Sequence, residues 1–529
     1  MSFYRLPQIG LSLDADEHDL RKRVCKLLNI ESAALRELRI ERKSIDARNK
    51  AAIKIVYGVV ADIDHTKNKR LPPNIAVPVA PEQPYQTPEP RRTWAIPPVV
   101  VGTGPAGLFA ALILAEAGLR PLVLERGDRV EDRDRAIQHF YQGGVLDEES
   151  NIQFGEGGAG TYSDGKLTCQ VKDEGGRNRK VIQELLAAGA PPEISYLAKP
   201  HIGTDQLIHI VSSLRNRIIE LGGTIQFRTR MDRLIIQGGQ LRGLIVNKNE
   251  RFETSAVVLA PGHSARDTFA MLVDCGVPME RKAFAIGVRI EHPQEMINYS
   301  QYGPAWGHPA LPVAEYKVSA RSSDNRGVYS FCMCPGGTVV NASSETGGVV
   351  CNGMSNFARN GKNANAALVV QVHPEDFGVP GLLGGVAFQR EWEQRAFALG
   401  GSDYLLPVQL WEDFVQNRIS TKLGSIEPSA GRGWRFANLH GCLPAFVIQA
   451  LQEGMLRFGS AISGFDRGDA VLTGVETRTS SPLRILRDEG CQSAIRGLFP
   501  AGEGAGYAGG IMSAAMDGIR VAEALIRSR

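Results

Sequence analysis

The segment VVVGTGPAGLFAALILAEAGLRPLVLERG, residues 99–127, constrains the fold more than any other part of this chain of 529 residues. It predicts a buried strand of three valines, a glycine-rich turn, an apolar helix and a second strand that ends at Glu125. The turn has GxGxxG spacing at Gly102, Gly104 and Gly107. These glycines permit a tight turn, let the backbone approach a pyrophosphate, and allow helix and strand to pack closely. The segment predicts a dinucleotide-binding fold; a tight turn without a ligand is the alternative.

The residues around this turn indicate which dinucleotide fits. The helix that follows presents free N–H groups to a phosphate, and Pro105 suits its first turn. Glu125 lies about 20 residues beyond the glycines, where a carboxylate accepts from a ribose hydroxyl and disfavours a 2′-phosphate. NADP is therefore not expected in this site. We expect Ala106 and Arg126 to belong to the same cofactor site.

The C-terminal segment GLFPAGEGAGYAGGIMSAAMDGIRVAEALI favours FAD over NAD. It predicts a strand, a glycine-rich loop that contains Glu503, and a helix that begins near Gly509. Such a returning segment would place an acid at a ribityl chain and a helix N-terminus against the pyrimidine edge of a flavin. A nicotinamide dehydrogenase needs no such segment. A glycine-rich helix packed for steric reasons alone is the alternative.

Several motifs together resemble one family. They are VGTGPAGLFAAL, NIQFGEGGAGTYSDGKL, VVLAPGHSARD, FCMCPGGTVVNASSE, NGMSNFARNGKNANAALVV, GVETRTSSPLRI and FPAGEGAGYAGGIMSAAMDGI. Residues from about 98 to 529 resemble the bacterial family of uncharacterised FAD-dependent dehydrogenases, or NAD(P)/FAD-dependent oxidoreductases. That family lies within the glutathione-reductase-like and aromatic-hydroxylase-like flavoproteins. The resemblance implies an FAD fold and a redox activity, and it leaves the substrate open.

The resemblance also implies which residues hold the cofactor. At the ADP half of FAD it places Gly102, Gly104, Gly107 and Glu125, and at the flavin half it places Gly502, Glu503, Gly510, Ile511 and Met512. In resembling flavoproteins the backbone near Met231 would flank the adenine.

Two further segments are expected near the cofactor. The buried strand AVVLAP leads to Gly262 and to His263. We interpret His263 as a histidine that packs within its loop; stacking on the flavin or donating near it is the alternative. In NIQFGEGGAGTYSDGKL, glycines that include Gly157 and Gly158 let the backbone pass close to the flavin or its phosphates. Lys166 is the charged residue expected nearby, and an ordinary solvated lysine is an equal alternative.

Cys332 and Cys334 are candidates for chemistry because residues two apart in a strand share one face. Beside a flavin they would act as a redox dithiol or supply a thiolate. Strand neighbours about 6.5–7 Å apart are, however, poorly placed for a disulfide. A buried cysteine that serves as a small apolar side chain is the favoured interpretation. A CxxxxC pair after the first helix is absent, which argues against a disulfide reductase.

Other polar residues are candidates for substrate contacts. Arg289 lies on a predicted strand of the substrate domain and, with Lys166, completes the catalytic candidates. NGMSNFARNGKNANAAL is expected to be a polar loop that enters a helix, where Arg359 could bind a carboxylate with two hydrogen bonds or simply be solvated. The position of Arg478 and Thr479, before the return to the cofactor domain, favours an active-site wall.

The expected fold class is α/β, with a Rossmann-type FAD-binding domain, an interleaved mixed α+β substrate domain and a small N-terminal α+β domain. The last is expected because two segments with strand character flank the helical DEHDLRKRVCKLLNI. The expected boundaries are 1–66 for the N-terminal domain, 67–97 for a proline-rich linker, 98–270 for the first part of the FAD domain, 271–475 for the substrate domain and 476–529 for the C-terminal return.

Composition limits the classes of partner that the protein is expected to bind. The net charge of +3, from 60 basic and 57 acidic residues, gives no overall field that favours nucleic acid or an anionic membrane. Eight cysteines without a signal peptide, and no apolar stretch of about 20 residues, predict a cytoplasmic protein without membrane spans. The sequence lacks HxxxH and CxxC spacing, so no metal site is predicted. The oligomeric state stays open.

The sequence therefore predicts an FAD-dependent oxidoreductase, a dehydrogenase-like enzyme that moves a hydride between a small organic substrate and flavin N5. One alternative is a flavin monooxygenase or reductase that uses NAD(P)H. A second is an RNA-modifying flavoprotein that docks RNA through its locally basic N-terminal domain, which contains RIERK and KNKR but no interleaved aromatic platform.

Overall fold

The computed structural model of the protein describes residues 3–64, 77–79, 84–91, 94–173 and 175–528. The extended tether that the sequence predicts over 67–97 lies partly outside these ranges, as does the KNKR segment. Within the predicted linker, Val77–Val79 forms strand β4, which pairs antiparallel with the first strand of the chain. The N-terminal sheet therefore extends into the predicted linker.

A five-stranded parallel sheet forms the nucleotide-binding part, in the order β23-β11-β5-β6-β7. Its central strand is the three-valine segment of the sequence, and all three valines are buried, as expected for a parallel strand covered on both faces. The short strand that precedes Met231 forms one edge of this sheet. The strands are β5 (Val99–Val101), β6 (Leu122–Leu124), β7 (Thr224–Gln226), β11 (Val257–Leu259) and β23 (Leu498–Pro500).

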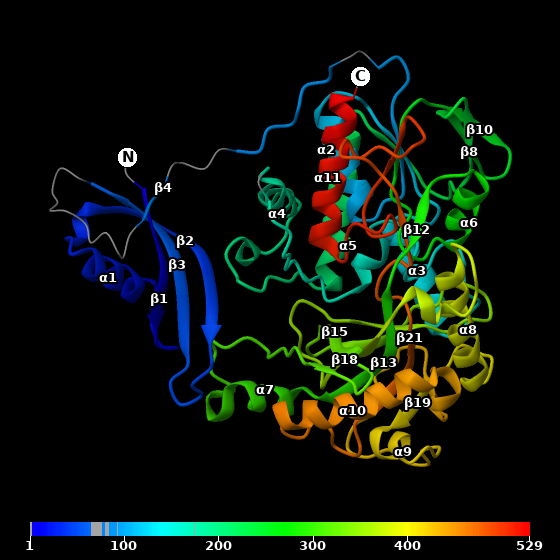
Figure 1. The fold of residues 1–529 in the computed structure, drawn as a ribbon. Helices are drawn as coiled ribbons and strands as arrows, with labels where there is room; N and C mark the ends of the chain where they lie inside the picture. Colours follow the sequence, from blue (N-terminus) through cyan, green and yellow to red (C-terminus); the bar gives the residue numbers. More distant parts are fainter. Residues whose placement is uncertain (1–2, 65–76, 80–83, 92–93, 174, 529) are drawn as a thin grey trace.

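Helices cover one face of this sheet and a small antiparallel sheet covers the other. Val100 packs among the helices, whereas Val99 and Val101 face the antiparallel sheet, because side chains alternate along a strand. Figure 1 shows α11 (red) alongside α2, the helix of the GxGxxG segment. The helical layer contains α2 (Pro105–Glu116), α4 (Arg177–Ala187), α5 (Thr204–Glu220) and α11 (Ile511–Arg527). The other layer contains β8 (Met231–Gln237), β9 (Gln240–Val246), β10 (Glu250–Glu253) and α6 (Arg266–Asp274), and α3 (Val130–Tyr141) packs beside α5.

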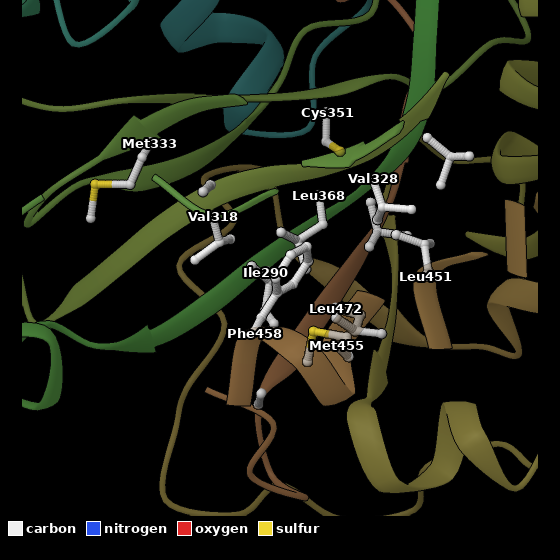
Figure 2. Close-up of a cluster of buried hydrophobic side chains, with 14 of the residues drawn as sticks. Ile290, Val318, Val328, Met333, Cys351, Leu368, Leu451, Met455, Phe458 and Leu472 are labelled. Atoms are coloured by element: carbon white, nitrogen blue, oxygen red, sulfur yellow. The ribbon is translucent and has the colours of Figure 1, made fainter. Parts of the chain in front are cut away.

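A seven-stranded mixed sheet builds the second large unit, in the order β14-β15-β18-β13-β21-β19-β20. Its core lies between the sheet and α10, where Leu451, Met455 and Phe458 pack against strand residues such as Ile290 and Leu368 (Figure 2). The strands are β13 (Phe284–Pro293), β14 (Ser319–Arg321), β15 (Gly327–Cys334), β18 (Asn363–Val372), β19 (Leu406–Leu410), β20 (Trp434–Phe436) and β21 (Val471–Glu476). The helices are α7 (Gln294–Tyr302), α8 (Gly384–Leu399), α9 (Trp411–Val415) and α10 (Ala445–Ala461).

Two short strand pairs accompany these sheets. β12 (Met279–Arg281) pairs with β22 (Leu483–Ile485), and β16 (Thr338–Asn341) pairs with β17 (Cys351–Met354). The prediction that NGMSNFARNGKNANAAL is a polar loop entering a helix is wrong in part, because this segment ends in strand β18. Ten residues of that strand pair antiparallel with β13, and this pairing outweighs the helix propensity of its alanines.

The N-terminal unit is a sheet in the order β2-β3-β1-β4 with one helix, α1 (Glu17–Leu28), packed on it (Figure 1). Asp16 and Asp19 form a capping box at the start of α1. The sequence analysis did not identify β2 (Leu35–Asp46), which lies between the two predicted strands, β1 (Phe3–Leu11) and β3 (Lys54–Ile63). The backbone of Lys43 in β2 hydrogen-bonds to the segment at 196–198, which fixes the sheet against the body of the protein. The predicted α/β fold class is confirmed.

Candidate active site

One cavity of about 380 Å³ opens at the carboxyl ends of the parallel strands. This is the edge at which open α/β sheets bind their ligands. Residues from the seven-stranded sheet, including Cys332 and Glu476, form part of its wall. Among the predicted cofactor residues, those that line it are Gly102, Gly104, Pro105, Ala106, Glu125, Arg126, Gly158, Met231, Gly262, Glu503, Gly510 and Ile511.

Four predicted cofactor residues do not line the cavity, namely Gly107, Gly157, Gly502 and Met512. A Cβ atom at Gly107 would lie 1.9 Å from the carbonyl oxygen of Gly102, and one at Gly502 would lie 2.6 Å from Cβ of Ala106. The N–H group of Gly502 also donates to Asp517 of α11 at 2.8 Å. These glycines let strand, turn and helix pack closely, which is the role expected of the third glycine of the motif.

Two helix N-termini face the cavity. Gly104 precedes α2 and Gly510 precedes α11, and none of the described side chains caps either helix. The first N–H groups of each helix are therefore left for a ligand, and both helix dipoles favour negative charge there. A Cβ atom at Gly509 or Gly510 would meet no described atom within 4 Å, so it would stand in the open space of the cavity.

Glu125 accepts more hydrogen bonds from the chain itself than the sequence indicates. Its buried carboxylate accepts from the N–H and hydroxyl groups of Thr103 at 2.9 and 2.6 Å. It also accepts from the N–H groups of Gly127 at 2.9 Å and Gly155 at 3.1 Å. A carboxylate offers about four acceptor positions. Glu125 thus ties the strand end to the turn and to the glycine-rich loop, and its contact with a ribose stays a prediction.

His263 and Glu503 meet at the cavity surface. The His263 Nδ1 atom lies 3.6 Å from a carboxylate oxygen of Glu503, and both residues line the cavity. The Nε2 atom of His263 is buried and has no hydrogen-bond partner among the described residues. A buried polar atom of this kind needs a partner. Together with the two uncapped helix ends, this orphaned atom fits a site built for a polar, anionic ligand such as FAD.

Lys166 forms part of the opposite wall and is not a solvated lysine. Its ammonium group donates to Asp164 at 2.6 Å and to the carbonyl oxygen of Met333. Asp164 also accepts from Nε of Arg359 at 2.9 Å. Burial lowers the pKa of Lys166, but the charge of Asp164 outweighs it and holds that pKa above its usual value. The cavity wall therefore carries a fixed positive charge.

Arg289 lies directly behind this wall. It is fully buried, and its Nε and Nη2 atoms donate to the Glu476 carboxylate at 2.7 and 3.2 Å. Its Nη1 atom donates to the Asn365 side chain at 2.6 Å and to the carbonyl oxygen of Cys332 at 3.1 Å. Burial opposes the charge of Arg289, yet the charge of Glu476 raises its pKa well above the usual value. Arg289 is thus a positioning residue, because Glu476 and Cys332 line the cavity and Arg289 does not.

Strand β15 is irregular at the two candidate cysteines. Its pairing with β18 shifts by one residue between Phe331 and Cys334, which marks a β-bulge. Cys332 lies in the bulge with a φ of 44°, in the left-handed region. Phe331 and Cys332 consequently both line the cavity, whereas Cys334 is fully buried. The expectation that the two cysteines share one face in regular alternation is therefore wrong.

The two cysteines nevertheless interact, because the Cys334 thiol donates to the carbonyl oxygen of Cys332 at 3.3 Å. A hydrogen bond from Cys334, helped by the charges of Arg289 and Lys166 and opposed by burial, lowers the pKa of Cys332 to about 5. The same hydrogen bond, together with burial, raises the pKa of Cys334 well above its usual value. The pair thus holds one proton, on Cys334, and one negative charge, on the Cys332 side of the cavity.

The polar lining residues that sequence reasoning missed include Asp164, Asn352 and Glu476. Asp164 and Glu476 stand in quoted motifs next to residues that were singled out, and a buried arginine such as Arg289 requires an acidic partner. Arg478 and Thr479 line the cavity, as their position in the chain favours. Arg359 does not line it, because its guanidinium group is held by Asp164.

Comparison with known proteins matches three segments of the chain. A model described as "FAD-dependent protein, C-terminal domain-like" matches residues 283–479, and one described as "FAD binding domain" matches residues 96–140. A domain of unknown function matches residues 4–62. An uncharacterized protein of Clostridium beijerinckii is 48% identical over 533 residues, which cover 99% of this chain and 98% of that protein. The chain belongs to this family of FAD-dependent proteins.

Membership of the FAD-dependent family confirms the resemblance seen in the sequence, and with it FAD as the cofactor and an oxidoreductase as the class of enzyme. A thiamine thiazole synthase of Aeropyrum pernix is 29% identical over 150 residues, or 28% of this chain and 43% of that protein. Among the described residues, no helix is long and apolar enough to cross a membrane.

Solved structures of flavoproteins resemble the chain only distantly. The flavin-dependent brominase Bmp2 has 14% identity and a TM-score of 0.37, with 81% of this chain and 79% of that chain covered. Glycine oxidase from Geobacillus kaustophilus has 12% identity and a TM-score of 0.36, with 82% and 94% covered. Likeness of this degree carries no argument about the reaction.

Proposed function

We propose that this FAD-dependent oxidoreductase transfers a hydride between a small organic substrate and N5 of its flavin. The observation that carries the proposal is the composition of one cavity. Its nucleotide side contains the GxGxxG turn and the start of α11, and its other side contains charged and polar side chains of the seven-stranded sheet. A cofactor held by the first side would leave the second side to contact a substrate.

On the nucleotide side, we propose that Gly102, Gly104 and the N-terminus of α2 hold the pyrophosphate. The uncapped N-terminus of α11 would receive the flavin, with Glu503 and His263 beside it. When bound, FAD supplies a two-electron acceptor at this point of the cavity. The backbone near Met231 would flank the adenine.

On the substrate side, the chain supplies two fixed cations, Lys166 and Arg478, and several hydrogen-bonding groups. Lys166 is held in place by Asp164, and Arg478 is held by the buried carboxylate of Glu393, with 2.9 and 2.7 Å contacts. Groups fixed in this way bind and orient a polar substrate without losing further freedom. Phe331, also on this wall, adds an apolar surface. We therefore propose a small substrate with a polar or anionic group attached to an apolar part.

The absorption spectrum of the purified full-length protein tests the first part of this proposal. We expect a yellow protein that keeps FAD through gel filtration. Lys166→Met should retain FAD and raise KM for an anionic substrate, whereas Lys172→Met, a substitution outside the cavity lining, should change neither. A protein that stays colourless after reconstitution with FAD would contradict the proposal.

A second measurement separates hydride transfer from a substrate and reduction by NAD(P)H. Anaerobic mixing with NADH or NADPH in a stopped-flow instrument follows loss of the flavin absorbance. Slow or absent bleaching by both supports a substrate dehydrogenase. Rapid bleaching by either would favour the monooxygenase or reductase alternative.

A further inference from the structure

We propose that Cys332 and Cys334 form a dithiol–disulfide couple that exchanges two electrons with FAD in the same cavity. The inference rests on the proposed function in one respect, namely that FAD occupies this cavity. It adds a second redox centre to the flavin, on the wall that the seven-stranded sheet provides.

The bulge in β15 gives the two cysteines different access to the cavity. Cys332 lies at the cavity surface, whereas Cys334 is fully buried behind it. The Cys334 thiol donates to the carbonyl oxygen of Cys332 at 3.3 Å, so its sulfur atom lies close to the residue that carries the other sulfur. Closing a disulfide requires the two sulfur atoms to approach to about 2.05 Å. The regular strand geometry that argues against such a bond is absent here, because the bulge interrupts it.

A structural role as small apolar side chains does not account for this arrangement. A non-glycine residue in the left-handed region is strained and persists where its surroundings impose it. Arg289 imposes it here, since its Nη1 atom binds the carbonyl oxygen of Cys332 at 3.1 Å and lies 3.8 Å from the Cys334 sulfur. An apolar packing role needs neither the bulge nor this contact.

The surrounding charges favour the reactive form of the pair. Lys166 binds the carbonyl oxygen of Met333, the residue between the two cysteines, and Arg289 approaches from behind the wall. Two cations next to a thiol stabilise its thiolate, which is the form that attacks in thiol–disulfide chemistry. Asp164 and Glu476 lie on the same wall, but each is ion-paired to one of these cations.

The electrons and atoms balance without a further reagent. Oxidation forms one bond between the two sulfur atoms, and the Cys334 thiol gives up its proton. The two electrons and this proton pass to FAD. In the reverse direction, two electrons and one proton return from reduced FAD, the sulfur–sulfur bond breaks, and a Cys332 thiolate and a Cys334 thiol are restored.

Anaerobic titration with dithionite tests the couple through its electron capacity. The FAD-loaded, air-oxidised full-length protein should take up four electrons per FAD, two in the flavin and two in the disulfide. Cys332→Ser and Cys334→Ser should each take up two. Cys275→Ser is the matched control, since Cys275 is also half-buried but lies outside the cavity lining, and this variant should take up four.

Labelling with maleimide, followed by mass spectrometry, gives a second readout that needs no variant. In the air-oxidised protein, denatured without reductant, Cys332 and Cys334 should stay unlabelled, and both should label after reduction. A flavin-containing wild-type protein that takes up only two electrons and labels at both cysteines would overturn the couple and leave the proposed function standing. A protein without flavin would overturn the proposed function and, with it, the couple.

Discussion

Replacing Arg289 with methionine tests the electrostatics behind the cavity wall, because it removes one half of a buried ion pair and keeps an apolar stem of similar length. Arg289 is 0% exposed, and the side chain of its partner Glu476 is 4% exposed. Breaking such a pair from one side costs about 3–5 kcal/mol, since one charge is left buried without a partner. Asn365 and the carbonyl oxygen of Cys332 lose the same donor, which places the expected loss toward the upper end.

Thermal denaturation of the FAD-loaded protein measures this loss. We expect the Tm of Arg289→Met to fall by on the order of 10 °C, because each kcal/mol shifts a domain of 150–250 residues by about 2–4 °C. Adding Glu476→Gln should recover at least half of the fall, because no charge is then stranded.

The control is Arg395→Met, whose ion pair with Glu391 spans 2.7 Å but is about half exposed, at 51% and 50%. Pairs of that kind contribute about 1 kcal/mol or less. If Arg289→Met loses no more stability than this control, or if the double variant is as unstable as the single one, the reasoning about the buried pair is refuted.

Three further predictions follow from single contacts. Gly107→Ala should abolish retention of FAD through gel filtration, because the added Cβ would lie 1.9 Å from the Gly102 carbonyl oxygen; full flavin occupancy would contradict this. In the reduced protein, the rate at which iodoacetamide alkylates Cys332 should rise with pH through an apparent pKa of about 5, and a midpoint near the ordinary value of 9.0 would count against the thiolate. The contribution of His292 to the free energy of unfolding should fall by up to about 3 kcal/mol between pH 6.5 and 4, because burial lowers the pKa of His292 to about 4 and only the unfolded chain takes up that proton in this window. His292→Gln can still donate to the carbonyl oxygen of Phe465, so it should flatten this part of the pH profile, and an unchanged profile would argue against His292 as its source.

The nucleotide-binding part was predictable from sequence because its signals are local. The three valines, the GxGxxG spacing and Glu125 lie within one strand-helix-strand unit, and each has a physical reason to occupy its position. The returning helix α11 was predictable for the same reason, from its glycine-rich start. What the sequence did not indicate is that four donors of the chain itself bind Glu125, because Gly155 reaches it from a separate loop.

The opposite wall depends on contacts between distant segments, which a single sequence does not reveal. The bulge at Cys332 arises from the register between β15 and β18, so alternation along one strand gave the wrong face. Glu476 lies on β21, and β13, which carries Arg289, lies between β21 and β18. The role of Glu476 therefore becomes visible only when the position of Arg289 is known. In the N-terminal sheet, β2 was missed because charged residues dominate its sequence, although it pairs with β3 along most of its length.

Strand β23 and helix α11 complete the nucleotide site, and their distance along the chain from α2 affects the order of events during synthesis. A ribosome that has finished α2 must still add residues 117–510 before the second helix N-terminus exists. The complete nucleotide-binding site therefore forms long after the first phosphate loop has been synthesised. A chain truncated before α11 would lack the flavin end of this site. Emergence of α11, rather than emergence of the glycine motif, is the step that completes the cofactor site.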